Sequence, residues 1–238
     1  MKTSKLLLSF CLIAFLSLHL TAQVKKPVAA TQKAAAGKLP GTRVKITTDM
    51  GVMIVRLYDA TPQHRDNFIK LVKQHFYDSL LFHRVISGFM IQGGDPLSKN
   101  AKPGEMLGMG GSEMTRIPAE FRPDLIHKKG VLAAARDNNP EKASSACQFY
   151  LVQGKVSSDI ELNQVECNTR NSLPEFSYTE EQRKIYKTNG GTPFLDMNYT
   201  VFGEVEKGLD VLDKIAGVAK DPGDRPVTDV RMKIELMK

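Results

Sequence analysis

The sequence contains no tryptophan, only three cysteines, and no run of more than two consecutive basic residues. Because tryptophan is missing, no side chain of this chain offers an indole N–H donor. The formal net charge is +7, yet the Lys and Arg residues are scattered along the chain. We therefore expect no nucleic-acid partner, since such binding is typical of a clustered basic surface.

Motifs for nucleotides and metals are also missing. Gly93-Gly94 belongs to neither a GxGxxG nor a Walker pattern, and Ser144-Ser145 is not part of a nucleophile elbow. The histidines show no spacing typical of a metal site. They are His19, His64, His75, His83 and His127. The sequence accordingly predicts neither a metal ion nor a cofactor.

An apolar stretch lies near the N-terminus, where LLLSFCLIAFLSL follows two lysines. It is shorter than the roughly 20 residues that a membrane span needs. The charged start, the apolar run and the small residue Ala22 are typical of a secretory signal peptide over residues 1–22. We expect an exported protein, periplasmic or secreted, with no membrane span in its mature chain. The alternative is an uncleaved N-terminal signal anchor.

Residues 23–42 are rich in Ala, Lys and Pro and show no apolar period, which predicts a flexible linker before a domain at residues 43–238. Behind the signal peptide two cysteines remain, Cys147 and Cys167. Export permits a disulfide, but two cysteines do not define a disulfide framework. We expect one core residue and one loop thiol, and their pairing stays open.

Short β-rich segments dominate the domain. They are VKITT (44–48), VMIVRLY (52–58), FHRVI (82–86), FMIQGG (89–94), VLAAA (131–135), CQFYLVQ (147–153), TVFGEVE (200–206) and VRMKIELM (230–237). The first two predict a hairpin. Helical spacing of apolar residues predicts a helix over residues 62–74, with Thr61 as N-cap, and a second helix within GLDVLDKIAG (208–217). This pattern favours a β-barrel or sandwich with helices at its ends.

A polar segment, residues 154–192, interrupts the strand pattern. Thr179 is followed three residues later by Gln182, which is a capping-box pattern and predicts a short helix over about residues 180–187. We expect this helix to dock on the barrel with Ile185 or Tyr186 as its apolar contact, because such a short helix is marginal without packing.

Four segments of the domain resemble the cyclophilins, a family of peptidyl-prolyl cis-trans isomerases. They are FHRVISGFMIQGGDP, GVLAAAR, SSACQFYLV and FLDMNYTVFGEV, and they occur in the family's order. The resemblance covers almost the whole domain from Val44 onward. It implies a mainly β fold, namely a closed eight-stranded antiparallel β-barrel capped by two α-helices, here with a partly helical insertion at 154–192.

The resemblance also implies the site. It assigns Arg84, Phe89 and Gln92 as catalytic residues. The residues that it places against the substrate are Met90, Ala135, Gln148, Tyr150, Phe194, Leu195 and Tyr199. For Arg84 one alternative from the residues themselves stays open, a buried arginine paired with an acid such as Glu120.

This chain departs from the family pattern at four positions. Tyr150, Phe194 and Tyr199 stand where better-known members have Phe, Trp and His. Cys147 replaces a serine and, on a strand, faces away from Gln148, so we expect it in the core. The rings are kept at 150, 194 and 199, while an indole N–H is lost at 194.

The resemblance implies an isomerase that accelerates cis/trans interconversion of Xaa-Pro bonds. Together with the signal peptide it predicts assistance to the folding of exported proteins, with proline-containing peptides and unfolded proteins as partners and a monomeric chain. The alternative function is a peptide-binding or chaperone module with little catalytic turnover.

Overall fold

The structure is a computed structural model that describes residues 41–237. The expected signal peptide, residues 1–22, lies outside this range, as do residues 23–40 of the expected linker.

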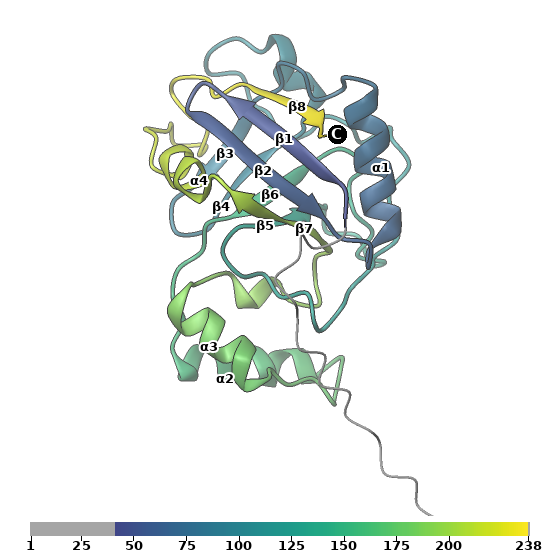
Figure 1. Ribbon diagram of the computed structural model, residues 1–238, viewed down its shortest axis with the longest axis vertical. Coiled ribbons are helices and arrows are strands. Elements are labelled where there is room, and N and C mark those ends of the chain that lie inside the picture. The colour runs from purple at the N-terminus through teal and green to yellow at the C-terminus, as the bar shows by residue number, and fades with distance from the viewer. Residues whose placement is uncertain (1–40, 238) are drawn as a thin grey trace, which may run out of the picture. The chain divides into compact units, whose positions relative to one another are not determined.

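Eight strands form one antiparallel sheet that curls around an apolar interior (Figure 1). Their bounds are β1 Arg43–Thr48, β2 Gly51–Leu57, β3 Phe82–Ile86, β4 Met90–Gly93, β5 Val131–Ala134, β6 Phe149–Val152, β7 Val201–Lys207 and β8 Met232–Leu236. In space they follow the order β3-β4-β6-β5-β7-β2-β1-β8. The predicted mainly β fold and the β1–β2 hairpin are confirmed.

The sheet is less closed than the closed barrel that was expected. The terminal strands β3 and β8 share no regular ladder, so the sheet is a curled half-barrel. Their backbones meet around their first residues, through the bridge between Leu81 and Arg231. The hydrogen bonds there run from Phe82 N to Val230 O (2.9 Å), from Met232 N to Leu80 O (2.8 Å) and from Ser79 N to Met232 O (2.9 Å). Beyond these contacts the two strands separate, and no further backbone pairing closes the ring in the part of the chain that the structure describes.

The α-helices are α1 Pro62–Lys73, α2 Asp159–Arg170, α3 Glu180–Thr188 and α4 Leu209–Ala216, and two 3₁₀ helices are η1 Pro96–Asn100 and η2 Pro193–Leu195. The predicted helices correspond to α1, α3 and α4. α1 and α4 pack their buried apolar residues onto the core of the sheet, as the two capping helices were expected to do. α2 was not predicted, because its sequence offers few apolar residues at helical spacing; its capping box, Ser158 with Glu161, was the available signal.

The start of α1 is capped differently from the sequence prediction. Thr61 makes no side-chain cap hydrogen bond. Instead the Glu120 carboxylate accepts the backbone N–H groups of Gln63 (3.1 Å) and His64 (3.0 Å). A carboxylate at this end of a helix is favoured by the unpaired N–H groups and by the helix dipole.

Three apolar clusters organise residues 41–237. The first fills the inside of the curled sheet and includes Phe82, Val85, Cys147 and Phe149. The second lies on the outer face of the sheet, and the third lies within the insertion around Tyr178 and Tyr186. The second contains Tyr58, Met90, Val131, Ala133, Ala135, Tyr150, Val152, Leu195 and Val201. Strand alternation explains the first two, since successive side chains point to opposite faces.

The insertion forms a small helical layer of its own. α2 and α3 lie side by side at one end of the described fold (Figure 1). Between them and the sheet lie Ile126, Leu162, Phe176, Tyr178 and Tyr186, all buried. Tyr186 is fully buried and Ile185 is partly buried, so the expected docking of α3 is confirmed, with Tyr186 as its main contact.

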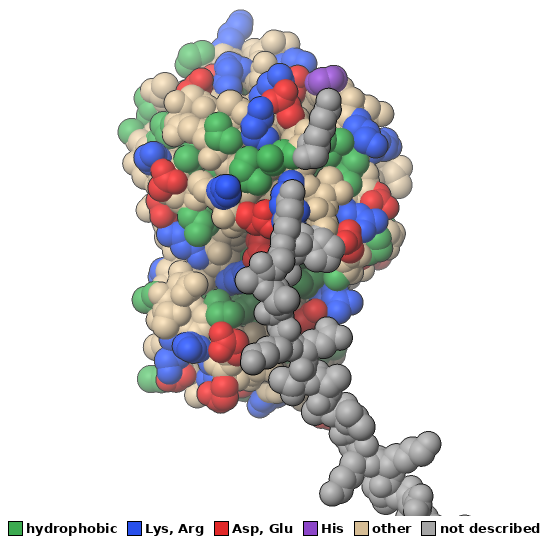
Figure 2. Space-filling model, in the orientation of Figure 1, with side chains coloured by type: hydrophobic (Ala, Val, Ile, Leu, Met, Phe, Trp, Pro, Cys, Tyr) green, Lys and Arg blue, Asp and Glu red, His purple; other side chains and the backbone are tan. Residues whose placement is uncertain are grey.

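The surface shows no single-sign block on the face drawn in Figure 2, where Lys and Arg side chains alternate with Asp and Glu. Ion pairs such as Lys45–Glu235 (3.0 Å) contribute to this mixture. Among residues 41–237 no helix combines the length and the apolarity that crossing a bilayer demands.

Candidate active site

A bulge in β3 turns Arg84 outward. Phe82 pairs with Gly93 and Arg84 pairs with Gln92, so His83 is an extra residue in β3 and the register shifts there. In a regular strand Phe82 and Arg84 would point to the same face. The bulge reverses the alternation, so that Phe82 lies in the inner cluster while Arg84 is exposed on the outer face.

The turn between β3 and β4 then brings Phe89 to the same face. Gly88 has φ 73°, a left-handed conformation that glycine adopts without strain. The turn is closed by the bond from Phe89 N to Ile86 O (3.0 Å). Gly88 and the His83 bulge together break the alternation that a continuous strand would impose.

One groove on the outer face brings together eight of the ten expected site residues. It is lined by Arg84, Phe89, Met90, Gln92, Ala135, Arg136, Tyr150, Leu195 and Tyr199. These residues come from β3, β4 and the turn between them, from β6, from the segment directly after β5, and from η2 and the segment after it. One end of the groove is therefore polar and cationic, and its floor and far wall are apolar and aromatic.

The remaining two expected residues lie at its margins. Phe194 is an exposed wall whose ring centroid lies 5.6 Å from that of Phe89. Gln148 is buried beside the neighbouring hollow, where its Nε2 donates to the carbonyl oxygens of Gly108 and Gly110 (both 2.9 Å). Gln148 therefore orients its neighbours from behind the groove.

A row of amide hydrogen bonds leads to the guanidinium. Gln148 Oε1 accepts from Gln92 Nε2 at 3.0 Å, and Gln92 Oε1 accepts from Arg84 at 3.4 Å. Because Gln148 is anchored on backbone carbonyls, the amide of Gln92 is held in one orientation, with its oxygen toward Arg84. The row positions the guanidinium without neutralising its charge.

No carboxylate within residues 41–237 pairs with Arg84. The alternative that Arg84 is a buried partner of Glu120 is wrong, because Arg84 is exposed and Glu120 binds His64 Nδ1 at 2.7 Å. A guanidinium stays protonated at any working pH. The groove therefore offers a fixed, uncompensated positive charge next to an apolar floor.

The hydroxyl of Tyr150 is used inside the protein and does not add a polar group to the groove. It lies 3.0 Å from His127 Nε2, and His127 Nδ1 lies 2.7 Å from Asp196 Oδ1. A carboxylate only accepts, so Nδ1–H donates to Asp196, and Nε2 is the ring nitrogen that pairs with the Tyr150 hydroxyl. Burial, with Tyr199 and Asp196 nearby, raises the pKa of Tyr150 well above its usual value, so the hydroxyl stays protonated.

The same carboxylate ties the insertion to the groove. Asp196 Oδ2 accepts from the hydroxyls of Tyr178 (2.7 Å) and Tyr186 (2.5 Å). Sequence reasoning missed this network, because its members are spread over four segments and each looks like an ordinary core residue. A chain of hydrogen bonds thus runs from α3 through Asp196 and His127 to the floor of the groove.

Arg136 is a second residue that sequence reasoning missed. Its guanidinium carbon lies 4.6 Å from the centroid of the Tyr199 ring, and its Nε donates to Asn198 O at 3.0 Å. These contacts hold the Asn198-Tyr199 segment against the end of β5. The available signal was its position directly after Ala135 in the GVLAAAR segment.

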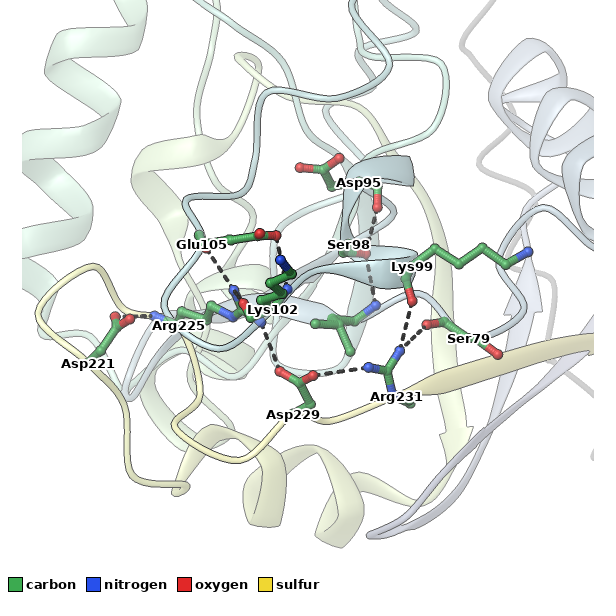
Figure 3. A network of polar contacts seen from close by, with 11 residues as sticks. Ser79, Asp95, Ser98, Lys99, Lys102, Glu105, Asp221, Arg225, Asp229 and Arg231 are labelled. Atoms are coloured by element: carbon green, nitrogen blue, oxygen red, sulfur yellow. Dashed lines mark hydrogen bonds and ion pairs between the residues drawn. The ribbon is translucent and has the colours of Figure 1, made fainter.

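Arg225, which lines a hollow together with Arg84, is the centre of a polar network. Figure 3 shows this network. The buried Arg225 donates to Lys102 O (3.0 Å), Glu105 O (2.7 Å) and Asp229 Oδ1 (3.0 Å), and Arg231 donates to Asp229 Oδ2 (3.1 Å). This network fixes the loop that continues to Gly108, which lies beside His83 and Arg84. The guanidinium of Arg84 is thus bordered by the restrained Gln92 amide and by this fixed loop.

Neither cysteine is paired. Cys147 is buried in the inner cluster, as expected, and burial raises the pKa of its thiol to about 11. Cys167 is exposed on α2, not in the loop that was expected. Within the described residues no group of three or more His, Cys, Asp or Glu side chains is arranged to hold a metal ion.

The chain is similar in sequence to known isomerases. Residues 43–235 match the family model described as "Cyclophilin type peptidyl-prolyl cis-trans isomerase/CLD". A protein of Staphylococcus saprophyticus assigned to the peptidyl-prolyl cis-trans isomerases is 32% identical over 207 residues, which cover 84% of this chain and 95% of that protein. A Staphylococcus haemolyticus protein with the same assignment is 35% identical over 191 residues, covering 79% and 87% of the two chains.

A solved structure shares the fold. The crystal structure of a cyclophilin-type peptidyl-prolyl cis-trans isomerase from Cryptosporidium parvum superimposes with a TM-score of 0.60 over 83% of this chain and 98% of that one. The two sequences are 22% identical over this match.

Proposed function

We propose that this chain is exported and that its outer-face groove around Arg84 accelerates Xaa-Pro isomerisation in exported proteins. The chain belongs to the cyclophilin-type peptidyl-prolyl cis-trans isomerases. The isomerase family follows from the sequence match. The site and the biological role are the parts that we propose.

The reaction explains why the groove combines a cation with an apolar floor. Rotation about the amide bond is slow because resonance raises a barrier of about 18–20 kcal/mol. In the twisted state the prolyl nitrogen loses conjugation and becomes able to accept a hydrogen bond. A site that binds this state more tightly than either planar form lowers the barrier without any covalent step or proton transfer.

Arg84 is the residue that we assign to the prolyl nitrogen. It is exposed, it has no acidic partner among residues 41–237, and Gln92 restrains it. One charged hydrogen bond contributes about 1.5–3 kcal/mol, whereas a 10⁴-fold acceleration requires about 5.5 kcal/mol. The remainder must come from the rest of the groove, so Arg84 cannot act alone.

The apolar part of the groove supplies a seat for the proline ring. Phe89, Met90, Tyr150 and Leu195 line it, and the Tyr150 ring is held in place by its hydroxyl bond to His127. The amide of Gln92 lies between Gln148 and Arg84 and also lines the groove, where it can bind the peptide backbone. The observation that carries the proposal is this joint placement of an unpaired guanidinium and an apolar seat on one rigid sheet.

The alternative, a module that binds peptides with little turnover, remains because Tyr150, Phe194 and Tyr199 depart from the family pattern. The geometry favours an enzyme, since the departures at 150 and 199 leave aromatic walls in the groove and the Tyr150 hydroxyl points to His127. A binding module would have no use for a restrained, unpaired guanidinium at the prolyl seat.

Refolding of a protein whose rate is limited by proline isomerisation tests the role. We expect catalytic amounts of the purified protein to accelerate the slow phase, and Arg84→Ala to lose this effect while still binding the unfolded chain. A wild-type protein that binds the unfolded chain without accelerating the slow phase would favour the binding module.

Export is tested separately by fractionating bacterial cells that express the full-length chain. The proposal predicts recovery outside the cytoplasm with a new N-terminus at Gln23. Recovery of the uncut chain in the membrane fraction would support the anchor instead, and recovery in the cytoplasm would refute export.

A further inference from the structure

A second hollow lies next to the groove, between the insertion and the segment after η2. It is lined by Val165, Asn168, Thr169, Ser172, Phe194, Met197 and Asn198. The first four residues belong to α2 and the turn behind it, so this hollow exists because the chain carries the insertion.

Phe194 is the wall that the groove and the hollow have in common. Its side chain is 58% exposed, which is unusual for a residue that borders two concave surfaces. Its ring lies beside that of Phe89 in the groove, with 5.6 Å between the centroids, and it also lines the hollow. A peptide seated in the groove can therefore continue past Phe194 into the hollow without leaving the surface.

The chemistry of the hollow suits an uncharged stretch of extended peptide. No charged side chain lines it. Asn168 Nδ2 and the Thr169 hydroxyl make no hydrogen bond to any other residue that the structure describes, so both are free to bind a peptide backbone. Val165 and Met197 provide apolar contact for a side chain.

The walls of the hollow are already ordered. Glu166 on α2 binds Arg183 of α3 (2.9 Å) and the backbone N–H of Tyr178 (2.7 Å). On the other wall Asn198 is held by Lys142 Nζ (2.7 Å) and by the bond from Arg136 to its carbonyl. A preformed site loses little conformational entropy when it binds, so even a small contact area can add measurable affinity.

We propose that this hollow is a subsite for the substrate, which binds uncharged residues that flank the Xaa-Pro bond on one side. The subsite begins beyond Phe194, the residue that separates it from the groove. The inference rests on the proposed function of the groove. It assigns to α2, and not to the predicted helix α3, the selection of longer substrates.

Binding of four-residue and eight-residue peptides tests the subsite. The core peptide is capped Ala-Ala-Pro-Ala, and two longer peptides add Ser-Leu-Ser-Leu before or after it. Calorimetry on the purified protein gives the dissociation constant of each, and exchange NMR gives the isomerisation rate of the core peptide. We expect one of the two extensions, and only one, to tighten binding at least fivefold.

Two variants of α2 test whether the gain in affinity of the extended peptide comes from the hollow. Asn168→Trp places a large ring in the hollow, whereas Ile160→Trp places the same ring on the same helix at a residue that is 81% exposed and outside the hollow. The ratio of core to extended dissociation constants should fall to about one in Asn168→Trp and keep its wild-type value in Ile160→Trp.

Three results would overturn the subsite: no gain from either extension, an equal gain from both, or the same ratio in the two variants. Failure of the proposed function is seen separately, as a core-peptide isomerisation rate no higher than that of the free peptide. The affinity ratio does not depend on turnover, so the two failures are distinguishable.

Discussion

Arginines in this chain fall into two groups according to what their guanidinium groups contact. Arg225 is buried and bound to carbonyl and carboxylate oxygens, and Arg43 forms an ion pair with Glu206 at 2.7 Å. Arg84 instead contacts the amide oxygen of Gln92 at 3.4 Å. Arg225 and Arg43 thus have their charge compensated by carboxylates, whereas Arg84 keeps its charge for a ligand.

The variant Arg84→Ala is therefore expected to lower kcat/KM for a capped tetrapeptide at least tenfold. The protein should melt at nearly the wild-type temperature, because the side chain is exposed and contributes little to the core. Arg84→Lys keeps the charge but not the planar fork, and we expect an intermediate rate.

A matched control for this experiment is Arg65→Ala. Arg65 lies on α1 and binds Asp59 and Asp66, both at 2.7 Å, away from the groove. Its loss should leave the rate unchanged. Equal rates for wild type and Arg84→Ala would refute the assignment of Arg84.

His83, the bulged neighbour of Arg84, should make stability depend on pH. It is buried, and burial lowers its pKa to about 4, with Arg84 and Arg225 acting in the same direction and Asp95 opposing. The unfolded chain, with a pKa near 6.5, binds more protons between pH 4 and 6.5. The stability from neutral His83 is therefore complete above pH 6.5 and is lost as the pH falls toward 4.

Urea unfolding at pH 7 and pH 5 measures this effect. We expect the contribution of His83 to lower the free energy of unfolding by about 2 kcal/mol when the pH falls from 7 to 5. His83→Gln should reduce the loss by a similar amount, although the variant starts from a lower stability. His64, whose pKa burial also lowers, leaves a residual slope in both proteins. Identical slopes for the two proteins would show that His83 titrates normally in the fold.

At the scale of elements, the insertion is attached to the groove through one carboxylate. Asp196 accepts hydrogen bonds from α3 and from the segment before α3 on one oxygen, and from His127 on the other. A buried carboxylate is costly unless such donors surround it. The insertion therefore stabilises the wall of the groove as well as extending it.

Removing one donor tests this attachment. Tyr186→Phe takes away the hydroxyl that binds Asp196, and we expect a loss of about 1.5–3 kcal/mol in the free energy of unfolding. The control is Tyr77→Phe, since Tyr77 is equally buried but its hydroxyl donates to the neutral carbonyl of Cys147 (3.3 Å). That bond is expected to contribute about 0.5–1.5 kcal/mol. A smaller loss in Tyr186→Phe than in Tyr77→Phe would contradict the role given to Asp196.

At the scale of the whole molecule, strand positions and most groove residues could be predicted from the sequence. Period-two apolar patterns fix which face of a strand is buried, and the family resemblance orders the strands. Cys147 and Tyr150 illustrate this, because alternation alone places them on opposite faces of β6. Phe89 and Gln92 could be assigned to the groove only from the family resemblance, because strand alternation alone places residues three apart on opposite faces.

Other features depend on contacts between distant segments and leave little trace in a local pattern. The His83 bulge is a register choice between β3 and β4, and no residue type announces it. α2 is polar along most of its length, and its buried Glu166 is paired with Arg183 of α3 and with the backbone N–H of Tyr178. Arg136 and Asp196 act through partners far away in the sequence.

The central claim is that the outer-face groove binds Xaa-Pro peptides and that Arg84 accelerates their interconversion there. One NMR measurement tests both parts, with isotope-labelled protein and an excess of a capped Xaa-Pro tetrapeptide. The account predicts that amide signals of groove residues such as Gln92 and Ala135 shift on titration. It also predicts cis/trans exchange much faster than the tens to hundreds of seconds of the free peptide, in the wild type but not in Arg84→Ala. Exchange at the uncatalysed rate in the folded wild type, or shifts confined to residues outside the groove, would contradict it.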